Sequence, residues 1–205
     1  MFKNRQDAGR QLARALERYR AARPLVLGLP RGGVIVAAEI ARALGGDLDV
    51  LLVKKLRAPG NPELALGAVS EDGHVYINRE LTDPDDPYLQ NEIQERRAEM
   101  AQQQRRYRAV KPRLSPTGRT AILVDDGLAT GATMIAAVQA TALAQPAQLV
   151  VAVPVSPPDA LGKLETAHAV VCLETPWDFR GVGQFYEDFT QVEDEIVIQL
   201  LKEFA

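Results

Sequence analysis

The sequence predicts an α/β fold in which a mainly parallel sheet is flanked by helices. Short apolar runs alternate with amphipathic helical patterns along most of the 205 residues. A strand–helix–strand unit of roughly 30 residues stands near the N-terminal end, and such a unit is typical of a parallel sheet. The same alternation returns towards the C-terminal end. Since 46% of the residues are hydrophobic, the chain can bury one sizeable core, and we expect a single domain over residues 1–205.

The spacing of apolar residues and the positions of glycine and proline predict the elements up to residue 63. A helix is expected before Pro24, because apolar residues recur there at steps of three and four. Strands over 25–29 and 49–54 enclose a helix over 34–44, which ends at a pair of glycines. Residues 57–63, RAPGNPE, have no periodicity and therefore predict a loop.

A hairpin and a long charged helix interrupt the alternation. Strands over 64–70 and 74–78 flank a plausible turn at Glu71-Asp72-Gly73. A charge-rich helix from about Pro87 to Arg108 follows, which either packs over the hairpin or mediates assembly. Beyond it the sequence predicts strands over 120–124, 149–153 and 169–173, and helices over 133–144 and 157–166. The core thus spans about 25–173 and is followed by a C-terminal extension.

The composition of the chain indicates which kinds of partner and which cellular compartment to expect. A net charge of -3 and a pI near 5.5 argue against a nucleic-acid partner. The one cysteine, Cys172, cannot form an internal disulfide and is expected to be a buried strand thiol. The start of the chain, MFKNRQDAGR, lacks the apolar segment of a secretion signal, and no apolar stretch approaches the roughly 18 residues that span a bilayer. We expect a cytoplasmic protein without a membrane partner.

The segment with the strongest functional signal is 121–134, AILVDDGLATGATM. An apolar strand ends at Asp125 and Asp126, and a loop of glycine, alanine and threonine leads into a helix. Ligands of open α/β sheets bind at the carboxyl ends of strands, and unpaired amides at a helix start attract phosphate. Because two carboxylates repel phosphate, they should face groups such as sugar hydroxyls. The alternative is an ordinary strand–helix turn with solvated aspartates.

This segment resembles the binding loop of the type I phosphoribosyltransferases, in which two acids and Thr-Gly-x-Thr follow a hydrophobic strand. The resemblance implies that Asp125 and Asp126 contact the ribose hydroxyls of phosphoribosyl pyrophosphate (PRPP). The order of elements between about residues 25 and 173 agrees with that family. The residues implied to complete the PRPP loop, which wraps the 5′-phosphate, are Gly127, Ala129, Thr130, Gly131, Ala132 and Thr133.

A second loop, Leu29-Pro30-Arg31-Gly32-Gly33, follows the first core strand. Its glycines allow a close backbone approach, and its arginine is a fork donor for phosphate oxygens. By resemblance it is the pyrophosphate loop, whereas taken alone it reads as a plain turn. The family also places a basic residue where Lys54 and Lys55 close a strand. Alternation predicts that only one of these lysines faces the site, and a solvated strand end is the alternative.

The resemblance implies transfer of the phosphoribosyl group from PRPP to a nucleobase-like acceptor, with release of pyrophosphate. The transition state resembles an oxocarbenium ion, so charge on the leaving group should be stabilised by Arg31, by Lys54 or Lys55, and by Mg²⁺. The ion would bind through substrate oxygens and water rather than in a protein cage. Ala129 stands where the hypoxanthine/guanine group has an aspartate, which argues against that chemistry.

Two variable segments carry the remaining predictions. The flexible loop that covers the site in this family corresponds to about 57–80, where Glu63 is the candidate acid or base and an ordinary exposed glutamate is the alternative. The specificity hood corresponds to about 174–190, where aromatic residues either stack on a planar base or form a packed cap or dimer contact. The candidate acceptor residues are Trp177, Asp178, Phe179, Arg180 and Tyr186.

A second function stays open, namely a regulatory protein of the same fold that binds PRPP or a nucleotide with little or no transferase activity. The motifs of P-loop proteins, Rossmann dinucleotide-binding domains and serine hydrolases do not occur. Since members of the resembled family commonly share loops near the site across a dimer, a homodimer is the expected assembly.

Overall fold

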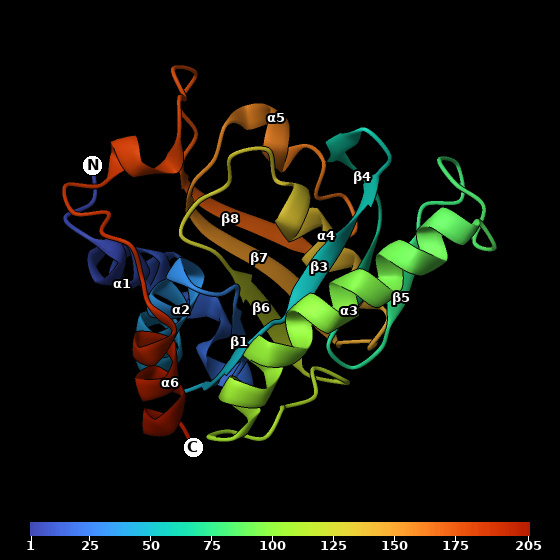
Figure 1. Cartoon of the computed structure of the whole chain (residues 1–205). Coiled ribbons are helices and arrows are strands. Elements are labelled where there is room, and N and C mark those ends of the chain that lie inside the picture. The colour runs from blue at the N-terminus through green and yellow to red at the C-terminus, as the bar shows by residue number, and fades with distance from the viewer.

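A five-stranded parallel sheet lies at the centre of the protein, in the order β2-β1-β6-β7-β8 (Figure 1). The computed structural model describes residues 1–61 and 64–205. All four neighbouring strand pairs of the central sheet are parallel, which confirms the predicted fold class. The strands are β1 (Leu25–Gly28), β2 (Asp47–Val50), β6 (Thr120–Val124), β7 (Gln148–Val155) and β8 (Ala169–Glu174).

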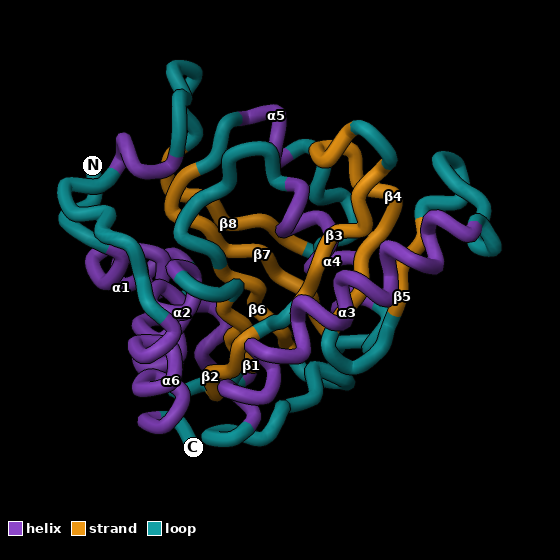
Figure 2. The backbone as a smooth tube through the Cα atoms, viewed as in Figure 1, coloured by secondary structure: helices purple, strands orange, loops and turns teal.

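One face of this sheet is covered by helices from both ends of the chain. The helices α1 (Arg5–Ala15), α2 (Gly32–Leu44) and α6 (Asp194–Glu203) gather there (Figure 2). Their apolar residues meet those of the sheet in one buried cluster, which includes Leu12, Ile40, Ile122 and Leu201. Short 3₁₀ helices, η1 (Glu17–Ala22) and η2 (Val182–Phe185), follow α1 and precede the C-terminal segment.

The other face is covered in three further layers. The helix α4 (Ala132–Ala142) packs on the sheet, and a three-stranded antiparallel sheet packs on α4. The long helix α3 (Pro87–Arg108) covers the outer face of that second sheet, which is one of the two roles that the sequence leaves open for it. In the described part of the chain no helix is both long and apolar enough to cross a membrane. The remaining elements are β3 (Val53–Ala58), β4 (Asn61–Ser70), β5 (Val75–Ile77) and α5 (Pro158–Leu161).

Several predicted boundaries are wrong. The strand predicted over 49–54 is two strands in different sheets, because the backbone changes partners: Leu51 N–H donates to Gly28 at 3.0 Å, and Glu71 N–H donates to the carbonyl of Leu52 at 3.1 Å. The loop predicted from residue 57 begins later, since β3 continues to Ala58 through an irregular register. The helix predicted over 157–166 ends at Leu161. The helix α6 was not predicted.

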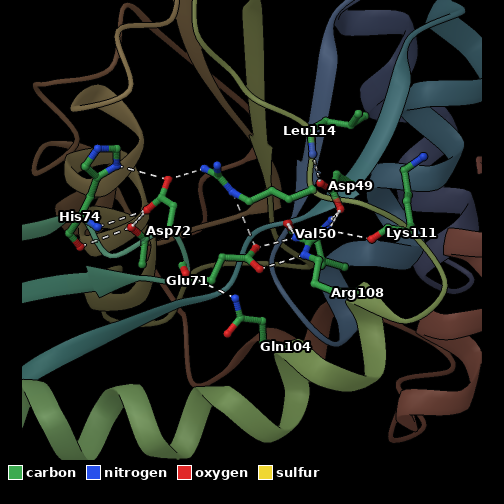
Figure 3. Close-up of polar contacts among 11 residues, drawn as sticks. Asp49, Val50, Glu71, Asp72, His74, Gln104, Arg108, Lys111 and Leu114 are labelled. Carbon is green, nitrogen blue, oxygen red and sulfur yellow. Dashed lines mark hydrogen bonds and ion pairs between the residues drawn. The ribbon is translucent and has the colours of Figure 1, made fainter.

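A buried ion network joins the second sheet and α3 to the central sheet (Figure 3). At the end of α3, the Arg108 guanidinium donates to Asp49 at 2.7 Å and to the two carboxylate oxygens of Glu71 at 2.5 and 2.8 Å. The Asp49 side chain has no exposed surface and also accepts from the amide of Leu114 at 2.9 Å. Because an unpaired buried carboxylate is costly, this network favours one placement of the two sheets.

Candidate functional site

The two predicted loops meet where β1 and β6 end. These strands are paired with Gly28 opposite Val124, so the loops that follow begin side by side. A Cβ atom on Gly32 would lie 1.9 Å from Asp126 Oδ2, and one on Gly33 would lie 2.7 Å from the Val124 carbonyl. Since any larger residue would collide there, the glycines permit this contact between the loops.

Asp125 and Asp126 form a coupled pair at the end of β6. Asp125 Oδ1 accepts from the Asp126 amide at 2.8 Å. Burial raises the pKa of Asp125 well above its ordinary range, and the neighbouring Asp126 carboxylate raises that pKa further. Asp126 is compensated, because its Oδ2 accepts from Arg5 Nε at 2.7 Å. The Arg5 guanidinium therefore offsets negative charge at the end of β6.

The loop between these acids and α4 presents backbone donors. Gly131 caps α4 with a φ of 76°, a left-handed conformation that glycine adopts without strain. Ala129, Thr130 and Thr133 are exposed. No hydrogen bond within residues 1–61 and 64–205 uses the amides of Thr130, Gly131 or Thr133. Unpaired amides at a helix start can bind an anion such as phosphate.

A cavity of about 440 Å³ opens beside the two acids, and we name it the carboxylate cavity. Arg31, which caps α2, contributes a cation at its edge and lies 3.7 Å from the carboxylate of Glu193. The cavity therefore offers both charges within reach of one ligand. It is lined by Arg5, Pro30, Arg31, Gly32, Asp125, Asp126, Phe189, Gln191 and Val192.

A second cavity of about 300 Å³, the lysine cavity, shares Pro30 with the first. Lys54, Lys55 and Thr133 line it, together with residues of α3. The two lysines lie on opposite faces of β3, because side chains alternate along a strand. Lys54 shares the face of Leu56, which packs on α3, whereas Lys55 shares the face of Val53, which packs on the α4 side.

The predicted acceptor residues of the hood lie outside both cavities. Trp177 is 89% exposed, and Asp178 and Arg180 are equally open to solvent. Phe179 stacks on Phe185 with ring centroids 5.6 Å apart. Tyr186 is buried against Phe2, and its hydroxyl donates to the Asp126 carbonyl at 2.6 Å. Phe179 and Tyr186 are therefore packed, as the alternative of a packed cap expects, whereas Trp177 is open to solvent.

Sequence reasoning missed the residues that the chain ends bring to the site. These are Arg5 from α1 and Phe189, Gln191 and Val192 from the C-terminal segment. One signal was available for Arg5, since it continues the apolar stripe of Ala8 and Leu12 at helical spacing. A charged residue on a buried stripe needs a partner, and here that partner is an acid of the PRPP loop.

Carboxylates beside the two cavities are the side chains that could contact a metal ion there. Among the described residues no group of three histidine, cysteine, aspartate or glutamate side chains could hold an ion. Asp125 and Asp126 line the carboxylate cavity, and Glu99 of α3 lines the lysine cavity. Glu63, the predicted acid or base, lies outside the described residues.

Comparison with known proteins agrees with this geometry. The family described as phosphoribosyl transferase domain matches residues 2–189. Two curated relatives from Mycobacterium tuberculosis, named "Putative phosphoribosyl transferase MT0597" (strain CDC 1551 / Oshkosh) and "Putative phosphoribosyl transferase Rv0571c" (strain ATCC 25618 / H37Rv), are each 43% identical over 205 residues. The match covers 98% of this chain and 46% of each relative, so the chain spans less than half of their length.

A solved structure extends the comparison over the whole chain. The crystal structure of TT1426 from Thermus thermophilus has 48% sequence identity and a TM-score of 0.95. The similarity covers 100% of this chain and 99% of that one. With the family match over residues 2–189, the chain belongs to the phosphoribosyl transferase domain family.

Proposed function

We propose that this protein is a Mg²⁺-dependent enzyme that transfers the phosphoribosyl group of PRPP to a nucleobase-like acceptor and releases pyrophosphate. The observation that supports this most is the contact between the two loops at Gly32 and Asp126. The Asp125 and Asp126 carboxylates and the Arg31 cation line one cavity at the carboxyl ends of β1 and β6, and the loop with the unpaired amides follows the same strand, β6. These are the groups that a sugar carrying both a phosphate and a pyrophosphate requires.

In this proposal each part of PRPP has its own set of contacts. The ribose hydroxyls donate to Asp126 and Asp125, and the 5′-phosphate accepts from the amides between Ala129 and Thr133. Pyrophosphate lies towards Arg31 and Gly32, with Lys54 or Lys55 on its far side. Bond breaking at the anomeric carbon moves negative charge onto the leaving pyrophosphate, and these fixed cations stabilise that charge where it develops.

Magnesium is the proposed cofactor. Because Mg²⁺ retains water and readily binds through substrate phosphates, the ion would be held mainly by pyrophosphate and ribose oxygens. When bound it would neutralise charge on the leaving group. No protein side chain is assigned as its ligand.

The acceptor is proposed to enter the carboxylate cavity on the side of Phe189 and Gln191, both of which line it. An aromatic ring there can contact a planar base. For Trp177, Asp178 and Arg180 to reach the same base, the hood would have to move, since they lie outside the cavity in this structure.

The test is pyrophosphate release from PRPP with Mg²⁺ across a panel of purines, pyrimidines and pyridine carboxylates, beside a reaction without acceptor. Release that depends on one acceptor class would establish the activity. Asp126→Asn should abolish it, whereas Asp85→Asn, which changes an exposed acid, should not. PRPP binding without release would favour the regulatory alternative, and a protein that does not bind PRPP would contradict the proposal.

A further inference from the structure

Arg5 occupies a position that helix stability does not explain. It is the first residue of α1, where the helix dipole disfavours positive charge. Its side chain is nevertheless buried, with only 8% of the residue exposed. Arginine is almost never buried to this extent unless it is paired, so its partners account for its placement.

Three contacts hold the Arg5 guanidinium. Nε donates to Asp126 Oδ2 at 2.7 Å, and Nη1 donates to the Thr190 carbonyl at 2.8 Å. The guanidinium carbon also lies 3.9 Å from the ring centroid of Phe189, a distance suited to a cation–π contact. Arg5 thus joins α1, the PRPP loop and the C-terminal segment at one point.

The contact with Asp126 leaves room for a substrate. Within the described residues, Arg5 is the one cation paired with Asp126, and the Asp125 carboxyl is the other side chain that contacts this carboxylate. The close approach of Gly32 places backbone beside Oδ2 and Arg5 Nε, where its added Cβ would come within 1.9 and 2.7 Å. The carboxylate is therefore constrained mainly on its Oδ2 side.

We propose that Arg5 is a positioning residue for the transfer reaction. Its guanidinium orients the Asp126 carboxylate so that this group accepts a ribose hydroxyl, and it holds Phe189 at the edge of the carboxylate cavity. This inference rests on the proposed function. If Arg5 affects PRPP binding through Asp126, its loss has no further effect on PRPP affinity once Asp126 no longer binds the sugar. A general role in folding would lower PRPP affinity in either background.

The experiment measures PRPP affinity by calorimetry and kcat/KM for pyrophosphate release in Asp126→Asn and in four further variants. Arg5→Gln removes the charge and should lower kcat/KM on the order of 100-fold, the cost of a displaced reacting group. Arg5→Lys keeps a cation but not the fork, so it should restore part of the loss. Arg10→Gln is the matched control, because Arg10 lies on the same helix and pairs with Glu39 at the surface.

The fourth variant combines Arg5→Gln with Asp126→Asn. If Arg5 acts through Asp126, the double variant binds PRPP no more weakly than Asp126→Asn alone. Losses that add would overturn the proposal, and so would an Arg5→Gln protein that binds and turns over PRPP as the wild type does. Should Arg5→Gln not fold, the comparison passes to Arg5→Lys, which must then show the same non-additivity. A wild-type protein that does not bind PRPP would refute the proposed function itself.

Discussion

The arginine–carboxylate clusters around Arg108 and around Arg5 differ in whether their carboxylates can reach a ligand. Around Arg108, all four carboxylate oxygens of Asp49 and Glu71 accept hydrogen bonds from the protein. Around Arg5, Asp126 has one oxygen bound by the guanidinium, and its side chain faces the carboxylate cavity. The same pairing chemistry therefore stabilises the fold where both carboxylates are enclosed, and it is available for binding where the carboxylate also lines a cavity.

The location of each cluster agrees with this distinction. Asp49 and Glu71 are sealed between the two sheets, with side chains 0% and 2% exposed. Asp126 stands beyond the end of β6, where parallel sheets bind ligands. We therefore expect changes at Arg108 to act on stability and changes around Asp126 to act on substrate binding.

The largest effect is expected from Arg108→Met. The variant removes the guanidinium paired with the buried acids Asp49 and Glu71 and leaves Glu71 only the longer contact with Arg113 at 4.0 Å. Such losses cost about 3–5 kcal/mol. For a chain of this size the melting temperature should fall by roughly 6–20 °C. Arg105→Met, an exposed change on the same helix, is the control and should melt within about 2 °C of the wild type. A similar small change for Arg108→Met would contradict the structural role of the network.

Gly32→Ala should affect binding more than stability. The new Cβ would meet Asp126 Oδ2 at 1.9 Å, so the carboxylate and Arg5 must move. We expect a stability cost of about 1–3 kcal/mol and PRPP affinity weakened at least about tenfold, the equivalent of 1.4 kcal/mol. Gly162→Ala is the matched control, because nothing lies within 4 Å of its Cβ position. Equal PRPP affinity in both variants would show that the loop contact does not shape the site.

Local patterns predicted most of the fold and the two loops that meet at the carboxyl ends of β1 and β6. The boundaries of α3 and the loops after β1 and β6 are predicted by apolar periodicity and by glycine and proline residues. Each of these signals lies within a few neighbouring residues, so it can be found in the sequence. The break at Leu51 depends on which carbonyl its amide meets, and the partner of Arg5 lies 121 residues away. Contacts between distant segments leave little local trace, so the chain ends and the hood could not be placed.

Asp125→Asn should raise stability at neutral pH while it abolishes transfer. Burial raises the folded-state pKa of Asp125, so the folded protein holds its proton at a pH where the unfolded chain, with a pKa near 3.9, has lost it. The contribution of Asp125 to the free energy of unfolding therefore decreases as pH rises above about 4. The asparagine variant has no carboxyl at this position and does not show that decrease. Melting curves from pH 4 to 8 should diverge as pH rises, whereas the control Asp85→Asn should follow the wild type.

Trp177→Ala should have the smallest effect on stability, within about 0.5 kcal/mol, because the side chain is 89% exposed. It separates the two proposed acceptor contacts, since Phe189 lines the carboxylate cavity and Trp177 does not. If the hood moves over a bound base, Trp177→Ala should raise the KM for the acceptor and leave PRPP affinity unchanged. If only Phe189→Leu raises that KM, the acceptor wall is built by the C-terminal segment that Arg5 holds, and the exposed tip of the hood has no part in recognition.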